Sequence, residues 1–205
     1  KGGREKFMRK KRMLRRLFGL GFLWRSSPEF LRLLFASAAL CGLDQAVKHR
    51  IDGEPEENFP RDMPGTKGKI RIVRAHNPGF SMGRMSDKPE FVKLSSLSIT
   101  AFLLGALQLF CALCPGRFFV RKLGISLAIG GAASNVIDRI RRGRVTDYLN
   151  IRIGSFRRSI VNIGDLMIQS GALLYGLSLL FSLFAALIRH AFGGRASLDG
   201  RKYDN

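Results

Sequence analysis

Three aspartates beside apolar segments are the residues of this sequence whose type and placement best suit chemistry. The chain has 205 residues with 35 basic and 15 acidic side chains, and between residues 91 and 198 only Asp138, Asp147 and Asp165 are acidic. Ionisable groups at a membrane boundary are costly and mark function by default. Carboxylates of this kind are candidates for a functional site, and each has to be weighed against a structural role.

Asp147 and Asp165 each also have a purely structural interpretation. Residues 145–153 alternate with a period of two, which predicts a strand with Asp147 on its apolar face. As a structural residue, Asp147 would protect an edge strand or pair with Arg139 or Arg144. Asp165 opens an apolar segment, where Asp is also a common residue of the first helical turn.

Two asparagines repeat one spacing before aspartates. Asn135 lies three residues before Asp138, and Asn162 lies three residues before Asp165. In a helical setting each pair would share one face. Asp138 is followed directly by Arg139, and we predict an ion pair between them that fixes the end of the third apolar segment.

The other polar and reactive residues favour structural roles. Asp44 and Lys48 are four residues apart, which predicts an ion pair across one helical turn, as an anchor at the membrane boundary. Cys111 and Cys114 have the spacing of a redox motif, but they end an apolar segment without a second ligand pair, so packing is expected. The three histidines have no metal-like spacing, and we expect neither a metal nor an organic cofactor. Small residues at 130–133 predict close packing of helices.

Four apolar segments predict an α-helical polytopic membrane protein. They cover residues 29–47, 91–114, 123–137 and 166–188. Between the first two, residues 52–90 are polar and rich in Pro and Gly, with an alternating piece at 70–73 that suits a short strand. We expect four transmembrane helices and a short extramembrane segment between spans one and two.

Charge sets the predicted domain organisation. Residues 1–27 carry ten basic side chains and one acid, and we expect a basic cytoplasmic arm there, a membrane domain at 28–190 and a polar cytoplasmic tail at 191–205. Four spans place both termini on one side, and the basic arm favours the cytoplasm.

Several classes of protein compete with a membrane enzyme. A formal charge of +20 with a mean hydropathy of +0.03 argues against a disordered basic protein, and three cysteines argue against a disulfide scaffold. A cleaved signal peptide fits the first apolar segment poorly, because its charged leader is too long. A small transporter or proton-relay protein predicts acids near span centres, whereas these lie at span ends. A membrane-tethered nucleic-acid binder would rest on charge alone.

Five motifs, in order, resemble those of the bacterial lipoprotein signal peptidases, or signal peptidase II, over about residues 29–188. They are Asp44-x-x-x-Lys48, Asn77-Pro-Gly79-Phe-Ser-Met-Gly83, Gly130-Gly-Ala-Ala-Ser-Asn135-x-x-Asp138-Arg139, Val145-Thr-Asp147-Tyr148 and Asn162-Ile-Gly-Asp165. Each motif lies at the boundary of a predicted span, and the ordered set is far more specific than any one of them.

The resemblance implies a four-helix aspartic peptidase of the bacterial inner membrane that acts near the outer face. Such an enzyme removes the signal peptide from a prolipoprotein by cutting before a cysteine that carries diacylglycerol. By motif, Asp147 and Asp165 would be catalytic. The supporting or substrate-binding residues would be Asp44, Lys48, Asn77, Gly79, Asn135, Asp138, Arg139 and Asn162. We expect a monomer that contacts prolipoprotein and membrane phospholipids and binds no nucleic acid.

The sequence departs from the family pattern at three places. Phe80-Ser81-Met82 replaces the usual Ala-Ala-Phe, Ser134 replaces Gly, and Gly164 replaces Ala. These changes keep small or apolar character, so they concern the substrate pocket more than the chemistry. The family also has a small extracytoplasmic β-sheet and a mobile segment between spans one and two, which would correspond to parts of residues 52–84.

The two aspartates differ in their predicted surroundings. Asp165 at a helix N-terminus would favour the ionised form, because that end carries partial positive charge. Asp147 on an apolar strand face would hold the proton, which formally belongs to the pair.

Overall fold

Four long helices and one small sheet make up the fold in the computed structural model, which describes residue 5, residues 28–153 and residues 159–199. The predicted arm at 1–27 lies outside these residues, apart from residue 5, as does the end of the predicted tail. The helices are α3 (Pro28–Gly53), α4 (Pro89–Leu113), α5 (Phe119–Arg142) and α6 (Ile163–Asp199). The four apolar segments are therefore helical apart from Cys114, and α3, α5 and α6 extend beyond their segments at both ends.

Three of the helices are long and apolar enough to cross a membrane: Pro28–Gly53, Pro89–Leu113 and Ile163–His190. The third predicted span, α5, is the most polar of the four because it lies at the centre of the bundle. Ser126, Ser134, Asn135 and Asp138 on α5 are buried against neighbouring helices. Polar residues on this helix thus face protein, and the apolar surface is supplied by the helices around it.

The sheet has four antiparallel strands in the order β1, β2, β3, β4. The strands are β1 (Arg61–Asp62), β2 (Ile70–Asn77), β3 (Val145–Ile151) and β4 (Ile160–Val161), and two short 3₁₀ turns cover Glu56–Asn58 and Ser81–Gly83. Strand β2 is longer than the predicted piece at 70–73. It pairs with β3 so that Ala75 lies opposite Asp147 and Asn77 opposite Val145.

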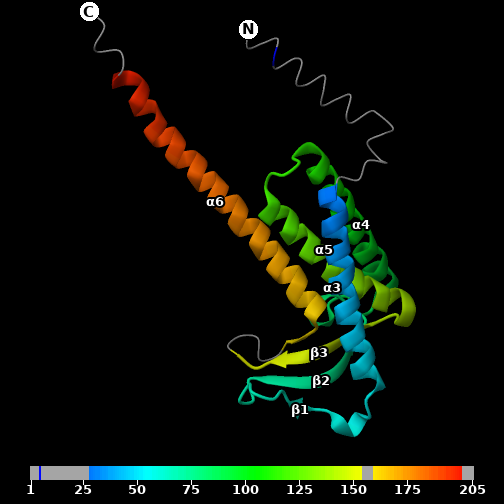
Figure 1. Ribbon diagram of the computed structural model, residues 1–205. Coiled ribbons are helices and arrows are strands. Elements are labelled where there is room, and N and C mark those ends of the chain that lie inside the picture. The colour runs from blue at the N-terminus through cyan, green and yellow to red at the C-terminus, as the bar shows by residue number, and fades with distance from the viewer. Residues whose placement is uncertain (1–4, 6–27, 154–158, 200–205) are drawn as a thin grey trace, which may run out of the picture.

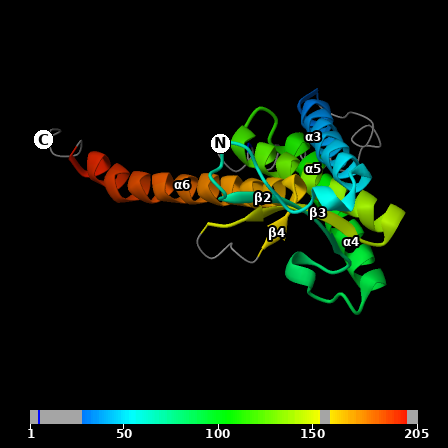
Figure 2. The same ribbon diagram turned by 90° about the horizontal axis from the view of Figure 1, so that it is seen from below.

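The sheet caps one end of the helix bundle. Figure 1 shows β1, β2 and β3 below the helices, at the end where α3 finishes and α6 begins. Figure 2, seen from below, shows α6 running along the sheet and then away from the other helices. This arrangement places the sheet at one end of the apolar helices, opposite the loop between α4 and α5 (Figure 1).

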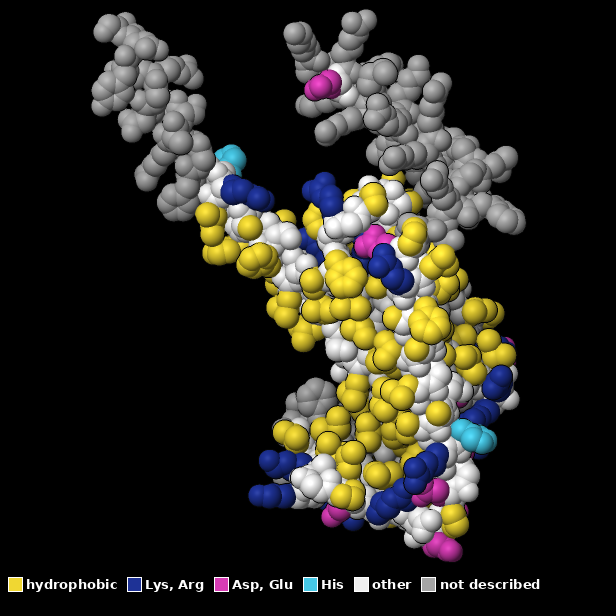
Figure 3. Space-filling view, in the orientation of Figure 1, with side chains coloured by type: hydrophobic (Ala, Val, Ile, Leu, Met, Phe, Trp, Pro, Cys, Tyr) yellow, Lys and Arg dark blue, Asp and Glu magenta, His cyan; other side chains and the backbone are white. Residues whose placement is uncertain are grey.

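The outer surface of the bundle is apolar. Phe102 on α4 and Phe181 on α6 are each 74% exposed. Figure 3 shows hydrophobic side chains over the helical part of this face, with Lys and Arg gathered toward its two ends. An apolar band between charged ends is what a lipid bilayer requires of a protein that crosses it.

Close helix packing depends on one glycine beside the functional region. A Cβ on Gly131 of α5 would overlap the carbonyl of Gly164 at the start of α6. The small residues at 130–133 therefore do what the sequence predicts, and they bring the first turn of α6 against α5. Cys111 also fulfils its prediction, since it is buried in the core cluster with Leu107 and Ile129.

Candidate active site

Asp147 and Asp165 share one asparagine. Asp147 lies on β3 and Asp165 lies in the first turn of α6. The side-chain amide of Asn162 donates to Asp147 Oδ1 at 2.7 Å, and the backbone N–H of Asn162 donates to Asp165 Oδ2 at 3.3 Å. The fold thus brings together the two carboxylates that the sequence singled out.

Asn162 also caps α6. Its Oδ1 accepts the backbone N–H of Asp165 at 2.8 Å while Asp165 Oδ2 accepts the N–H of Asn162. This reciprocal arrangement has the form of a capping box, which satisfies N–H groups that a helix start leaves free. The helix-start interpretation of Asp165 is therefore correct. The cap fixes the Oδ2 atom of the carboxylate, and the Oδ1 atom faces α5.

Asn135 on α5 links the aspartates to the bundle. Its amide donates to Asp165 Oδ1 at 2.8 Å, and its Oδ1 accepts from Asn162 Nδ2 at 3.1 Å and from Lys48 Nζ at 2.8 Å. Because both ends of this amide are engaged, its orientation is fixed. A fixed donor toward Asp165 stabilises the ionised carboxylate.

Asn77 approaches from the other side, at the end of β2. Its Nδ2 lies 3.4 Å from Asp147 Oδ2 and donates to the carbonyl of Phe80 at 3.1 Å. Its Oδ1 accepts the N–H of Gly79 at 2.9 Å. Asn77 and Gly79, both expected in the site, therefore shape the turn that closes over Asp147.

Asp44 and Lys48 form the predicted ion pair, with 2.9 Å between Lys48 Nζ and Asp44 Oδ2, and the pair lies inside the protein instead of on its surface. Both side chains are fully buried, and Lys48 also pairs with Asp138 at 3.0 Å. Tyr148 donates to Asp44 at 2.8 Å, and Ser134 donates to it at 2.6 Å. The pair is thus the centre of a buried polar network that joins α3, α5 and β3.

Ser134 and Tyr148 were missed as parts of this network. Tyr148 stands next to Asp147 in the fourth motif, and Ser134 precedes Asn135 in the third. Their places in the motifs could therefore have indicated that both residues belong to the network. Burial raises the pKa of the Tyr148 hydroxyl, and the nearby Asp44 charge raises it further, so this hydroxyl stays a donor.

The predicted ion pair between Asp138 and Arg139 is wrong. Consecutive helical residues point about 100° apart, and Asp138 turns to Lys48 while Arg139 turns away. Arg139 donates to the carbonyl of Gly79 at 2.8 Å and to that of Asn135 at 3.4 Å. Its Nε is buried and has no hydrogen-bond partner among the described residues.

The environment of Asp147 favours its protonated form. The side chain is buried, and this desolvation together with the charge of Asp165 raises the pKa of Asp147 to about 7. The amides of Asn162 and Asn77 oppose the shift without cancelling it. A carboxyl of this kind can act as an acid near neutral pH.

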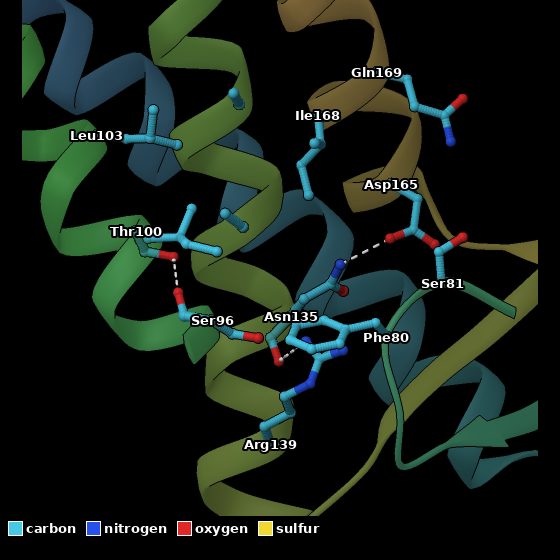
Figure 4. Close-up of a pocket in the computed structure, with 13 residues that line it drawn as sticks. Phe80, Ser81, Ser96, Thr100, Leu103, Asn135, Arg139, Asp165, Ile168 and Gln169 are labelled. Atoms are coloured by element: carbon cyan, nitrogen blue, oxygen red, sulfur yellow. Dashed lines mark hydrogen bonds between the residues drawn. The ribbon is translucent and has the colours of Figure 1, made fainter. Parts of the chain in front are cut away.

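A groove of about 470 Å³ opens beside Asp165 between α4, α5 and α6. Figure 4 shows Asp165 and Asn135 at one side, with Thr100 and Leu103 of α4 across the groove and Phe80 beside Arg139. The remaining wall is mostly apolar. Its lining residues are Phe80, Ser81, Ser96, Ile99, Thr100, Leu103, Ala128, Ala132, Asn135, Arg139, Asp165, Ile168 and Gln169.

The helical fold and this site define a polytopic membrane protein with an aspartate pair of which one member, Asp165, lines an apolar groove. The sequence model of the family described as signal peptidase (SPase) II matches residues 36–181. The chain therefore belongs to the signal peptidase II family, and it is a peptidase with several helices in the bacterial inner membrane.

Individual relatives agree with this assignment. The chain is 30% identical over 154 residues to the lipoprotein signal peptidase of Xylella fastidiosa strain M12, which covers 75% of this chain and 91% of that protein. It is 31% identical over 149 residues to the lipoprotein signal peptidase of Xanthomonas axonopodis pv. citri strain 306, covering 73% and 86%. The fold also resembles a bacterial membrane enzyme solved at 2.3 Å by the in meso method, with a TM-score of 0.63, 25% identity, and 74% and 89% of the two chains covered.

Proposed function

We propose that this protein is an intramembrane aspartic endopeptidase that removes the signal peptide from diacylglyceryl-modified prolipoproteins. Cleavage falls before the lipid-modified cysteine. The observation that carries the proposal is that Asn162 joins Asp147 to Asp165, and that Asp165 lines an apolar groove. A transporter is disfavoured, because the acids lie at the sheet end of the helices and the chain belongs to a peptidase family.

The two aspartates divide the work of peptide hydrolysis. Ionised Asp165 takes a proton from water as the water oxygen bonds to the scissile carbonyl carbon, and protonated Asp147 gives its proton to the carbonyl oxygen. The resulting diol collapses when Asp147 recovers a proton from one hydroxyl and Asp165 passes its proton to the amide nitrogen. The C–N bond then breaks, giving a carboxylic acid and an amine, and both aspartates return to their starting forms.

The contacts of each aspartate support this division. Asp165 accepts N–H donors from Asn135 and Asn162 at the start of α6, and both donors and the helix N-terminus favour a negative charge. Asp147 is buried beside that charge, and its pKa of about 7 keeps a large share protonated at neutral pH.

Arg139 supplies a free donor to the substrate. Its Nη2 donates to the Gly79 carbonyl, whereas its buried Nε lacks a partner among the described residues. The Arg139 side chain as a whole lines the groove. An unpaired buried donor is costly, and a substrate carbonyl would satisfy it. Arg139 would thereby hold the peptide backbone of the substrate while the aspartates act.

The location of the site fits a substrate that arrives through lipid. A helical signal peptide reaches the groove between α4 and α6 from the bilayer, and water reaches the aspartates from the sheet end. We place that end at the outer face of the membrane and both termini in the cytoplasm. We further propose that the protein acts as a monomer surrounded by phospholipid.

The test is cleavage of a diacylglyceryl-modified prolipoprotein by purified protein in detergent. Wild type is expected to cleave, and Asp147→Asn and Asp165→Asn are each expected to lose activity by several orders of magnitude while keeping the wild-type melting temperature to within a few degrees. Asp62→Asn is the control and should stay active, because Asp62 lies on the edge strand β1 with its side chain 57% exposed and outside the groove. Activity that survives in Asp147→Asn or Asp165→Asn would refute the aspartic mechanism.

A further inference from the structure

Tyr148 is a large buried side chain beside the aspartate pair, and the proposed reaction gives it no task. It is only 2% exposed and follows Asp147 on β3. Successive side chains of a strand point to opposite faces, so Tyr148 shares a face with Thr146 and turns away from Asp147. The hydroxyls of both residues on this face reach α3, where Tyr148 contacts Asp44 and Thr146 contacts Asp52.

The Tyr148 hydroxyl joins two helices. It donates to Asp44 Oδ1 at 2.8 Å, and it accepts the backbone N–H of Ile163 at 3.1 Å. Ile163 is the first residue of α6, where a helix leaves N–H groups without a partner of its own. A hydroxyl has one hydrogen to donate and a carboxylate only accepts, so the direction of both bonds is fixed. Tyr148 therefore ties the start of α6 to α3.

Asp44 is a firm anchor for this tie. Its side chain is completely buried, and its Oδ2 pairs with Lys48 at 2.9 Å and accepts from the Ser134 hydroxyl at 2.6 Å. A Cβ on Gly164 would lie 3.0 Å from the same oxygen, so the first turn of α6 also packs on this carboxylate. With both of its oxygens engaged, Asp44 offers the Tyr148 hydroxyl an acceptor in a fixed place.

The turn that is tied in this way carries the groups that act on both aspartates. Asn162 directly precedes Ile163, and Asp165 follows it by two residues. The Asn162 side chain donates to Asp147 at 2.7 Å and accepts the N–H of Asp165 at 2.8 Å. A shift of Ile163 would therefore move Asp165 and the amide that orients Asp147 together. A misplacement of about 1 Å in an active site can lower the rate roughly a hundredfold.

We propose that Tyr148 is a positioning residue for the cleavage reaction. Its hydroxyl ties the first turn of α6 to Asp44, and this tie sets the direction of Asp165. Tyr148 is not among the described residues that line the groove, so it acts through its neighbours and not on the substrate. This inference rests on the proposed function and adds one residue to the machinery that performs it.

The experiment measures kcat and KM for a diacylglyceryl-modified prolipoprotein in detergent, together with the melting temperature of the same preparation. Tyr148→Phe removes only the hydroxyl oxygen. We expect kcat to fall about tenfold, because Asp165 is held less precisely. KM should stay within about twofold of wild type, because the wall of the groove is unchanged.

Ile163→Pro breaks the same tie from its other end. Proline has no N–H to give to the Tyr148 hydroxyl, yet it suits the first position of a helix. This variant should lower kcat to a similar degree. It decides the question if Tyr148→Phe does not fold.

Thr146→Val is the matched control. It removes a hydroxyl that is equally buried on the same face of β3, but that hydroxyl bonds to Asp52 at 3.0 Å and does not reach α6. Its kcat should equal that of wild type even if its melting temperature falls. A wild-type kcat in folded Tyr148→Phe, or equal losses of kcat in Tyr148→Phe and Thr146→Val, overturns the inference and leaves the proposed function intact. Failure of wild type to cleave would instead reject the proposed function itself.

Discussion

At the scale of single residues, the site is a set of amides arranged around two carboxylates. Asn162 contacts both aspartates, Asn135 contacts Asp165, and Asn77 contacts Asp147. Each amide has a fixed direction because its other end is also bound or belongs to a helix cap. Neutral donors of this kind orient the two acids without adding the positive charge that would remove the proton from Asp147.

The rate of cleavage should depend on pH through this pair. As the pH rises through about 7, Asp147 loses the proton it must donate, so kcat/KM should fall on the alkaline side. As the pH falls, the ionised partner gains a proton and can no longer activate water, so kcat/KM should fall on the acid side as well. The two limits belong to the pair rather than to either residue. Measuring kcat/KM from about pH 4 to about pH 9 checks this, and a rate that keeps rising through the alkaline range would contradict the assignment.

The buried cation beside the site makes a second prediction at this scale. Lys48 lies between Asp44 and Asp138, and all three side chains are almost completely buried. Lys48→Met leaves two carboxylates buried without their counter-ion, which should lower the free energy of unfolding by about 3–5 kcal/mol. Chemical unfolding in detergent, followed by circular dichroism, measures this change.

Lys93→Met is the matched control for Lys48→Met. Lys93 pairs with Glu90 on the surface of α4, where the Glu90 side chain is 76% exposed. A surface pair is worth about 0–1 kcal/mol. Equal effects of the two substitutions would mean that burial of the Lys48 network does not matter to stability.

At the scale of elements, the position of the aspartates depends on how α5 and α6 meet. Asp165 is in the first turn of α6, and the residue before it, Gly164, packs its carbonyl against Gly131 of α5. Asn135 follows one turn along α5 on the same side. The close approach therefore sets the distance from Asn135 to Asp165 as well as the packing of the helices.

Gly131→Ala should separate the two helices and reduce activity. The added Cβ overlaps the Gly164 carbonyl, and overpacking of this kind typically costs about 1–3 kcal/mol of stability. The shift of α6 also moves Asp165, so kcat should fall more than the loss of folded protein explains. Melting temperature and kcat/KM of the same preparation separate the two effects.

Gly105→Ala on α4 provides the comparison. A Cβ there meets nothing within 4 Å, and alanine is favoured over glycine inside a helix by roughly 0.5–1 kcal/mol. Wild-type activity and an equal or higher melting temperature are expected. A gain in stability from Gly131→Ala as well would show that the α5–α6 contact is not tight.

At the scale of the whole molecule, the sheet and the loop between α4 and α5 lie at opposite ends of the bundle (Figure 1). The proposed orientation puts the sheet outside the cell and that loop in the cytoplasm. Lys69→Cys on the exposed rim of the sheet should react with a membrane-impermeant maleimide in intact spheroplasts. Arg117→Cys in the α4–α5 loop should react only after permeabilisation, and the reverse pattern would invert the orientation.

Much of the fold could be predicted from the sequence, because the local composition of a membrane helix is enough to identify it. Apolar segments at 29–47, 91–114 and 166–188 predicted helices that the structure contains, since a helix in lipid must be apolar over its length. The ends of the helices were predicted less accurately. Helix α6 runs on to Asp199, into the residues expected to form a tail, because helical hydrogen bonding continues past the apolar part.

The sequence by itself indicated most of the residues of the candidate site, and the tertiary structure decided which of them meet and what they contact. Asp147 and Asp165 stood out because carboxylates are scarce in apolar surroundings, which is a property of composition. Pairing depends on direction in space, so the sequence predicted a partner for Asp138 in Arg139, whereas the fold gives it Lys48 from another helix. The free Nε of Arg139 and the ring of Phe80 in the groove likewise appear only when α4, α5 and the turn after β2 come together. Local patterns report what each segment is made of, but long-range packing decides which side chains are neighbours.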